Sequence, residues 1–128
     1  MPHVIIEYSD DLVPVPDIDA VFVSIHGVIV ELVGAPISNV KSRAYAVHSL
    51  VGDADPSRAM VHAEIALMEG RTRDAKAALA EAVVGILCDA FAPASSGRDV
   101  QTTVEVRDIE RATYAKHPPG TISTPPLP

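Results

Sequence analysis

The chain has 128 residues, a mass of 13.5 kDa and a formal net charge of −7, which together predict one acidic domain. Its apolar content of 48% rules out disorder for most of the chain, its acidic balance argues against a nucleic-acid partner, and its single cysteine excludes an internal disulfide or a multi-cysteine zinc site. Because there is neither an uncharged apolar run of about 18 residues nor a basic segment followed by an apolar one at the start, we expect no transmembrane helix, no signal peptide and a cytoplasmic location.

The first half predicts a strand, a helix and a second strand. Residues 2–8 are short and β-branched and predict a strand, and residues 39–50 predict another. Between them, residues 18–33 predict a helix that Asp17 caps and that Gly34 and Pro36 end. We expect its inner face to hold Phe22, Ile25, Ile29 and Leu32.

The second half predicts the same order of elements. Residues 60–68 and 100–109 predict strands, and residues 73–91 predict an Ala-rich helix with Thr72 as its N-cap. The buried side of this helix is expected to hold Leu79, Val83, Ile86, Leu87 and Ala90, with Cys88 also in the core.

The two halves therefore read as a duplication, with units at about 2–50 and 60–109, because Ala35-Pro36 ends the first helix and Ala92-Pro93 the second. The predicted fold class is α+β: a four-stranded mixed sheet with two helices on one face. Because the predicted strands carry Val and Ile on both sides, we expect the uncovered face to contact other subunits of a homo-oligomer. A single domain over 1–117 and a Pro-rich tail over 118–128 complete the prediction.

The sequence contains no phosphate-binding loop, dinucleotide fingerprint or metal-ligand spacing of histidines, so no cofactor and no metal are expected. Pro2 is the candidate for chemistry. Met1 before a small residue is normally removed, and removal turns the nitrogen of Pro2 from an amide into a secondary amine. An apolar and cationic surround would lower the pKa of that amine toward the range of a general base.

Three segments resemble one known family. Residues 1–9, Met-Pro-His-Val-Ile-Ile-Glu-Tyr-Ser, are similar to the start of 5-carboxymethyl-2-hydroxymuconate isomerases, members of the tautomerase superfamily. Residues 40–43 lie where that family has an Ile-Arg-x-Arg stretch, with Lys41 in place of an arginine. Residues 61–72 resemble the second strand and turn of that family, and the Glu-Gly-Arg-Thr turn at 69–72 also resembles that of the short 4-oxalocrotonate tautomerases.

The resemblance implies a homotrimeric, cofactor-free isomerase of aromatic catabolism that acts on a small anionic enol or unsaturated keto acid. In that reading Pro2 is the general base, and Arg71, Lys41 and Arg43 bind the carboxylates of the substrate or its developing negative charge. Two alternatives stay open. One is a hydratase, dehalogenase or decarboxylase that uses protonated Pro2 as an acid, and the other is an oligomeric binding protein without catalysis.

Overall fold

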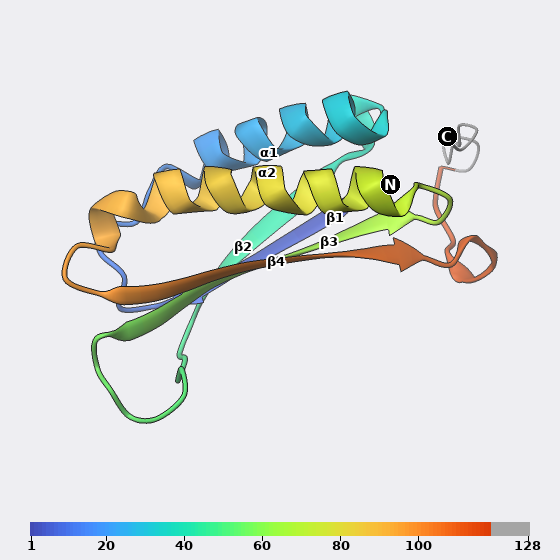
Figure 1. The fold of residues 1–128 in the computed structure, drawn as a ribbon. Helices are drawn as coiled ribbons and strands as arrows, with labels where there is room; N and C mark the ends of the chain where they lie inside the picture. The colour runs from blue at the N-terminus through green and yellow to red at the C-terminus, as the bar shows by residue number, and fades with distance from the viewer. Residues whose placement is uncertain (119–128) are drawn as a thin grey trace.

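Two β-α-β units follow one another along the chain, and the computed structural model describes them within residues 1–118 (Figure 1). The first unit consists of β1 (His3–Ser9), α1 (Ile18–Val33) and β2 (Lys41–Val47). The second consists of β3 (Arg58–Met68), α2 (Arg73–Phe91) and β4 (Asp99–Ile109). Short 3-10 turns follow at Ile37–Asn39, Ala92–Ala94 and Arg111–Thr113. Most of the predicted tail, residues 119–128, lies outside the described residues.

Both helices start and end at the predicted residues because their caps are encoded locally. The side chain of Asp17 accepts a hydrogen bond from the backbone N–H of Ala20, and that of Thr72 accepts one from the N–H of Ala75. Gly34 ends α1 with a φ of 72°, a left-handed conformation that favours glycine. These local signals therefore account for the starts of both helices and for the end of α1.

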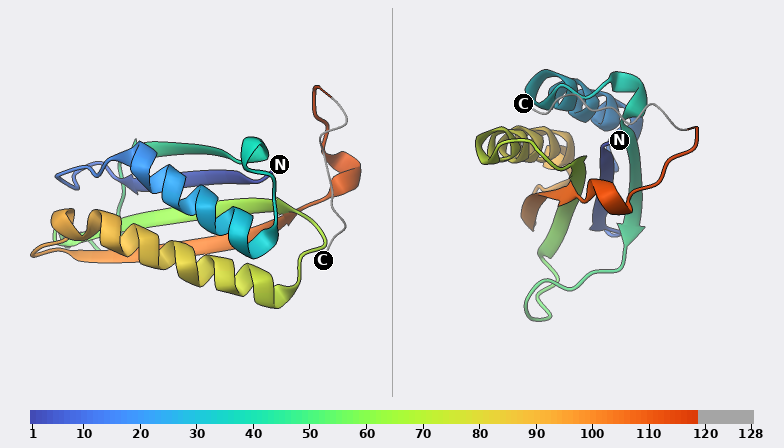
Figure 2. Two further views of the ribbon diagram at one scale, coloured as in Figure 1. Left: turned by 90° about the horizontal axis from the view of Figure 1, so that it is seen from above. Right: turned by 90° about the vertical axis from the view of Figure 1, so that its right-hand side faces the viewer.

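The four strands form one mixed sheet in the order β2-β1-β3-β4. β1 runs parallel to β2 and antiparallel to β3, and β3 runs parallel to β4. Both helices cover the same face of this sheet (Figures 1 and 2). The predicted fold class is confirmed.

The core lies between the helices and the sheet, and there the predicted helix phases need correction. α1 buries Val21, Ile25, Ile29 and Val33, whereas Phe22 is half-buried and Leu32 is 37% exposed. α2 buries Leu79, Val83, Leu87 and Phe91, whereas Ile86 and Ala90 are half-buried and Cys88 is exposed. α1 has apolar residues on every side, so periodicity alone left its orientation open by one residue.

The uncovered sheet face is more polar than predicted. It presents Lys41, Arg43 and Tyr45 from β2, His62 and Glu64 from β3, and Arg107 from β4. The expectation of Val and Ile on both sides was wrong because the apolar residues of β1 and β3 alternate toward the helices.

The segment Arg73–Ala94 is long and apolar enough by length and composition to span a membrane, since an 18-residue window within it has a mean hydropathy of 1.6. In this fold α2 and the turn after it occupy that segment. α2 places its four buried side chains against the sheet, as the core helix of a globular domain does.

Candidate active site

The candidate site lies at the end of the sheet where β1 begins (Figure 2). Because β1 is antiparallel to β3, this same end holds the last residues of β3 and β4 and the turn into α2. The last turn of α1 reaches it from above, and the residues after β4 reach it from the open face (Figure 1). Segments from the beginning, the middle and the end of the described chain therefore meet at Pro2.

Pro2 is buried, and Met1 is only 5% exposed. The carbonyl oxygen of Pro2 accepts a hydrogen bond of 3.0 Å from the backbone N–H of Lys41, which fixes the start of β1 against β2. A cavity of only about 20 Å³ remains beside them. It is lined by Met1, Pro2, Ala35, Pro36, Asn39, Met68 and Arg71. Met1 thus occupies the space next to Pro2, and with Met1 attached the nitrogen of Pro2 is an amide.

The electrostatic environment at the chain start disfavours a protonated amine. Burial, followed by the charges of Lys41, Arg71 and Lys116, lowers the pKa of the Met1 amine from 8.0 to about 5. An amine in this environment is a free base at neutral pH, and it lies among cations that can attract an anionic ligand.

Lys41 lies beside His3 in the register of the sheet, at the first position of β2. Its ammonium group is exposed and donates a 2.9 Å hydrogen bond to the carbonyl oxygen of Asn39. This side chain is near Pro2, as predicted, and a compact ammonium group stands where the resembling family has a guanidinium.

Arg71 also lines the cavity beside Pro2, but its guanidinium is bonded to the backbone. Nε and Nη2 lie 3.4 and 3.3 Å from the carbonyl oxygen of Val33, and Nη1 lies 3.2 Å from that of Met68. Burial and the charge of Arg111 lower the pKa of Arg71. In this chain Arg71 joins the end of α1 to the end of β3 as well as contributing positive charge.

Arg43 is not at the cavity beside Pro2. It lies two residues after Lys41 on β2, on the open face of the sheet, where its Nη1 is 3.3 Å from Nδ1 of His3. The three predicted cations are therefore divided, with Lys41 and Arg71 beside Pro2 and Arg43 in a neighbouring pocket.

Four residues at this end of the sheet were not among the predicted site residues. Lys116 adds positive charge at the amine, and Arg111 adds it at Arg71, with one buried nitrogen, Nη2, that has no hydrogen-bond partner among the described residues. His3 and Tyr114 hydrogen-bond to each other across 111 positions of sequence. No spacing pattern could have revealed these contacts, because they depend on how the segment after β4 returns to β1.

A larger cavity, about 400 Å³, lies away from this site, between α1 and α2. Its charged lining residues are Asp17 and Asp89, both acidic. It therefore does not suit an anionic ligand, and the smaller cationic site at Pro2 remains the candidate.

Comparison with known proteins gives one family and a set of similar folds. The sequence model of the 5-carboxymethyl-2-hydroxymuconate isomerase family matches residues 2–120. A solved 5-carboxymethyl-2-hydroxymuconate isomerase from Deinococcus radiodurans R1 is 26% identical, with a TM-score of 0.76 over 90% of this chain and 87% of that one. A 5-carboxymethyl-2-hydroxymuconate delta-isomerase is 20% identical, with a TM-score of 0.76 over 91% and 87% of the two chains. A fused 4-OT symmetric trimer is 23% identical, with a TM-score of 0.70 over 91% and 92%. No curated protein matches the sequence significantly.

Proposed function

Because the chain belongs to the 5-carboxymethyl-2-hydroxymuconate isomerase family, and so to proteins of isomerase and tautomerase type, we propose that Pro2, once Met1 is removed, is the general base of a cofactor-independent tautomerase. The substrate is a small anionic enol or unsaturated keto acid, similar to 5-carboxymethyl-2-hydroxymuconate. The Pro2 amine takes a proton from the enol and returns it to a carbon of the same molecule.

One observation carries this proposal: the start of β1 lies in a buried, cationic environment, where burial and the charges of Lys41, Arg71 and Lys116 lower the pKa of the Met1 amine to about 5. Around the Pro2 amine that removal of Met1 creates, the same environment favours the unprotonated form, as a base requires. It also disfavours the alternative of a hydratase, dehalogenase or decarboxylase, since those reactions need Pro2 as a protonated acid.

The cations around Pro2 would bind the anionic substrate. Lys41 and Arg71 lie at the cavity, and negative charge that develops on the substrate's oxygen is stabilised by fixed positive charge in a partly buried site. Removal of Met1 frees the volume that its side chain now fills, which gives the substrate access to the amine.

The test is ketonisation of 2-hydroxymuconate and phenylenolpyruvate, followed by ultraviolet absorbance. Protein that mass spectrometry shows to lack Met1 is compared with the Pro2→Ala variant and with protein that retains Met1. We expect turnover by the first, a large loss in Pro2→Ala, and none above buffer when Met1 is retained. Equal turnover with and without Met1 would contradict the proposal.

We also propose that the chain is a cytoplasmic homotrimer. The similarity to a fused 4-OT symmetric trimer supports this assembly, and the exposed free thiol of Cys88 is compatible with a reducing compartment. Sedimentation equilibrium is expected to give about three times the chain mass of 13.5 kDa, and a mass of one chain would contradict it.

A further inference from the structure

A second pocket lies on the open face of the sheet, directly beyond the start of β1. Its volume is about 230 Å³, and its polar lining consists of His3, Arg43, Glu64, Arg107 and Tyr114. His3 follows Pro2 in the chain, so this pocket adjoins the proposed base.

The hydrogen bonds in this pocket have one consistent direction. Arg43 can only donate, so Nδ1 of His3 accepts its hydrogen bond at 3.3 Å. The proton of the neutral imidazole is then on Nε2, which donates to the hydroxyl oxygen of Tyr114 at 2.8 Å. The hydroxyl of Tyr114 keeps its own proton, and among residues 1–118 no acceptor for that proton is found.

The neutral state of the imidazole agrees with its surroundings. Burial, and then the charges of Arg43 and Lys41, lower the pKa of His3. At neutral pH the ring therefore accepts from Arg43 and donates to Tyr114 at the same time.

The charges in the pocket are not balanced. Arg107 is paired with Glu64, with 3.1 Å between Nη2 and Oε1. Arg43 has no carboxylate partner in the described part of the chain, and its guanidinium keeps N–H groups beyond the one that His3 uses. Arg43 and Tyr114 therefore have N–H and O–H groups that can still donate hydrogen bonds, while Glu64, the acidic residue of the pocket, is already paired with Arg107. A planar carboxylate, which only accepts hydrogen bonds, complements this arrangement.

We infer that this pocket is a carboxylate subsite, in which Arg43 and the hydroxyl of Tyr114 hold one carboxylate of the substrate and His3 is the residue that positions the hydroxyl. The inference rests on the proposed function, because a carboxylate held here places the rest of a short enol acid near the amine of Pro2. A substrate with a second carboxylate then has cationic groups at both ends of the site, with Lys41 and Arg71 at the other.

The test uses Tyr114→Phe with Tyr45→Phe as the matched control, both in protein without Met1. Tyr45 is 51% exposed on the same sheet face but does not line the pocket. Loss of one hydrogen bond to a charged ligand is expected to raise the KM for 2-hydroxymuconate about tenfold in Tyr114→Phe, with little change in kcat. Tyr45→Phe is expected to match the parent protein.

Binding of adipate, an unreactive dicarboxylate, gives a readout that does not depend on turnover. Calorimetry is expected to show adipate binding that weakens about tenfold in Tyr114→Phe and at least as much in Arg43→Gln. His3→Gln, whose amide N–H can still donate to Tyr114, is expected to keep more of the affinity than His3→Leu. This rescue separates a positioning role from a purely structural one.

The outcomes separate the two proposals. If no enol is turned over, the proposed function fails, and adipate binding still decides on the subsite. If enols are turned over but adipate binds Tyr114→Phe as tightly as the parent, or binds neither, the subsite is overturned and the tautomerase stands. An equal weakening by Tyr45→Phe would also overturn the subsite.

Discussion

Arg71 binds the last carbonyl of α1: two of its guanidinium nitrogens lie 3.3 and 3.4 Å from the oxygen of Val33. The third contact, to the carbonyl oxygen of Met68, places the same side chain at the end of β3. A residue expected to bind substrate therefore also connects a helix to the sheet.

This double role predicts a loss of stability on substitution. Arg71→Ala leaves two partly buried carbonyl groups without these donors, and we expect the free energy of unfolding to fall by about 1–3 kcal/mol in urea denaturation. Arg73→Ala is the control, since Arg73 is exposed on the first turn of α2. If both variants unfold like the parent, Arg71 is free to serve a ligand alone.

The chain that retains Met1 is expected to lose stability as the pH falls from about 8 toward about 5. In the unfolded chain the amine has its ordinary pKa of 8.0 and takes up a proton below it, whereas in the folded chain the pKa is about 5. The unfolded state thus binds more protons over this window, which favours unfolding as the pH drops. Urea denaturation across the window measures the effect.

Acetylation of the amine gives the control for this pH dependence. The acetylated chain should show a flatter curve between about pH 8 and 6.5, where the amine acts before the histidines titrate. Below that range His3 and His26, whose pKa values burial also lowers, add a further loss in both proteins. Identical curves with and without acetylation would show that the amine is not in a buried cationic environment.

The position of Lys41 near the chain start predicts how its substitution shifts the dependence of kcat/KM on pH. After burial, its charge is the largest cause of the lowered pKa of the Met1 amine. Lys41→Gln should therefore raise the pKa of the Pro2 amine and move the rise of kcat/KM to higher pH. Lys76→Gln is the control: Lys76 lies on α2 and is paired with Asp108 of β4, and its loss should not change the dependence of kcat/KM on pH.

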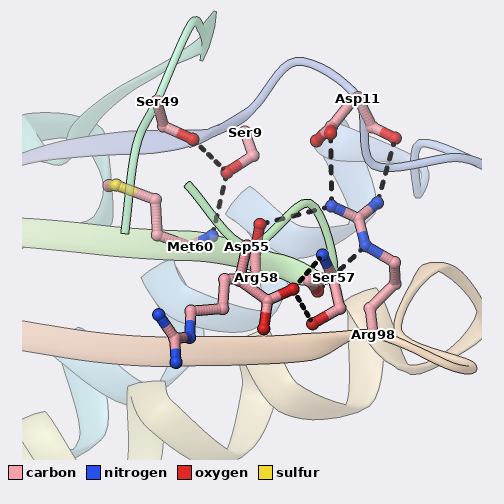
Figure 3. A network of polar contacts seen from close by, with 8 residues as sticks. All are labelled: Ser9, Asp11, Ser49, Asp55, Ser57, Arg58, Met60 and Arg98. Atoms are coloured by element: carbon pink, nitrogen blue, oxygen red, sulfur yellow. Dashed lines mark hydrogen bonds and ion pairs between the residues drawn. The ribbon is translucent and has the colours of Figure 1, made fainter. Parts of the chain in front are cut away.

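At the opposite end of the sheet, the buried hydroxyl of Ser9 is expected to contribute to the free energy of unfolding. Ser9 is 1% exposed, and its Oγ accepts from the backbone N–H of Met60 at 2.9 Å and pairs with the hydroxyl of Ser49 at 2.5 Å (Figure 3). Ser9→Ala leaves the Met60 N–H without its acceptor, so we expect a loss of about 1–3 kcal/mol in the free energy of unfolding. Ser49→Ala keeps that acceptor and should cost less.

The fold could be predicted from the sequence where the signals are local. Asp17, Gly34 and Thr72 mark helix ends through their own side chains or backbone, and both helices have the predicted bounds. β2 is shorter than predicted, Lys41–Val47 rather than 39–50, because Ile37–Asn39 forms a 3-10 turn after Pro36. That turn depends on hydrogen bonds such as Asn39 N–H to Pro36 O, which residue type alone did not indicate.

The candidate site was predictable only as a set of residue types. Pro2, Lys41 and Arg71 were found from position and resemblance, and the structure brings these three together. The partners of Arg71 and the contact between His3 and Tyr114 join residues 38 and 111 positions apart. Such contacts follow from tertiary packing, so they could not be predicted from periodicity or from a motif.

The duplicated architecture limits where amine chemistry can take place. β3 starts the second unit as β1 starts the first, but Arg58 follows Ser57 within a continuous chain, so every backbone nitrogen there is an amide. The cations at that end are paired with acids, Arg58 with Asp53 and Arg98 with Asp11. Arg98 also binds the backbone carbonyl of Ser57 (Figure 3). The two halves share one architecture but use their positive charges differently: at the start of β1 these charges surround an amine, whereas at the start of β3 they bind acidic side chains and a loop carbonyl.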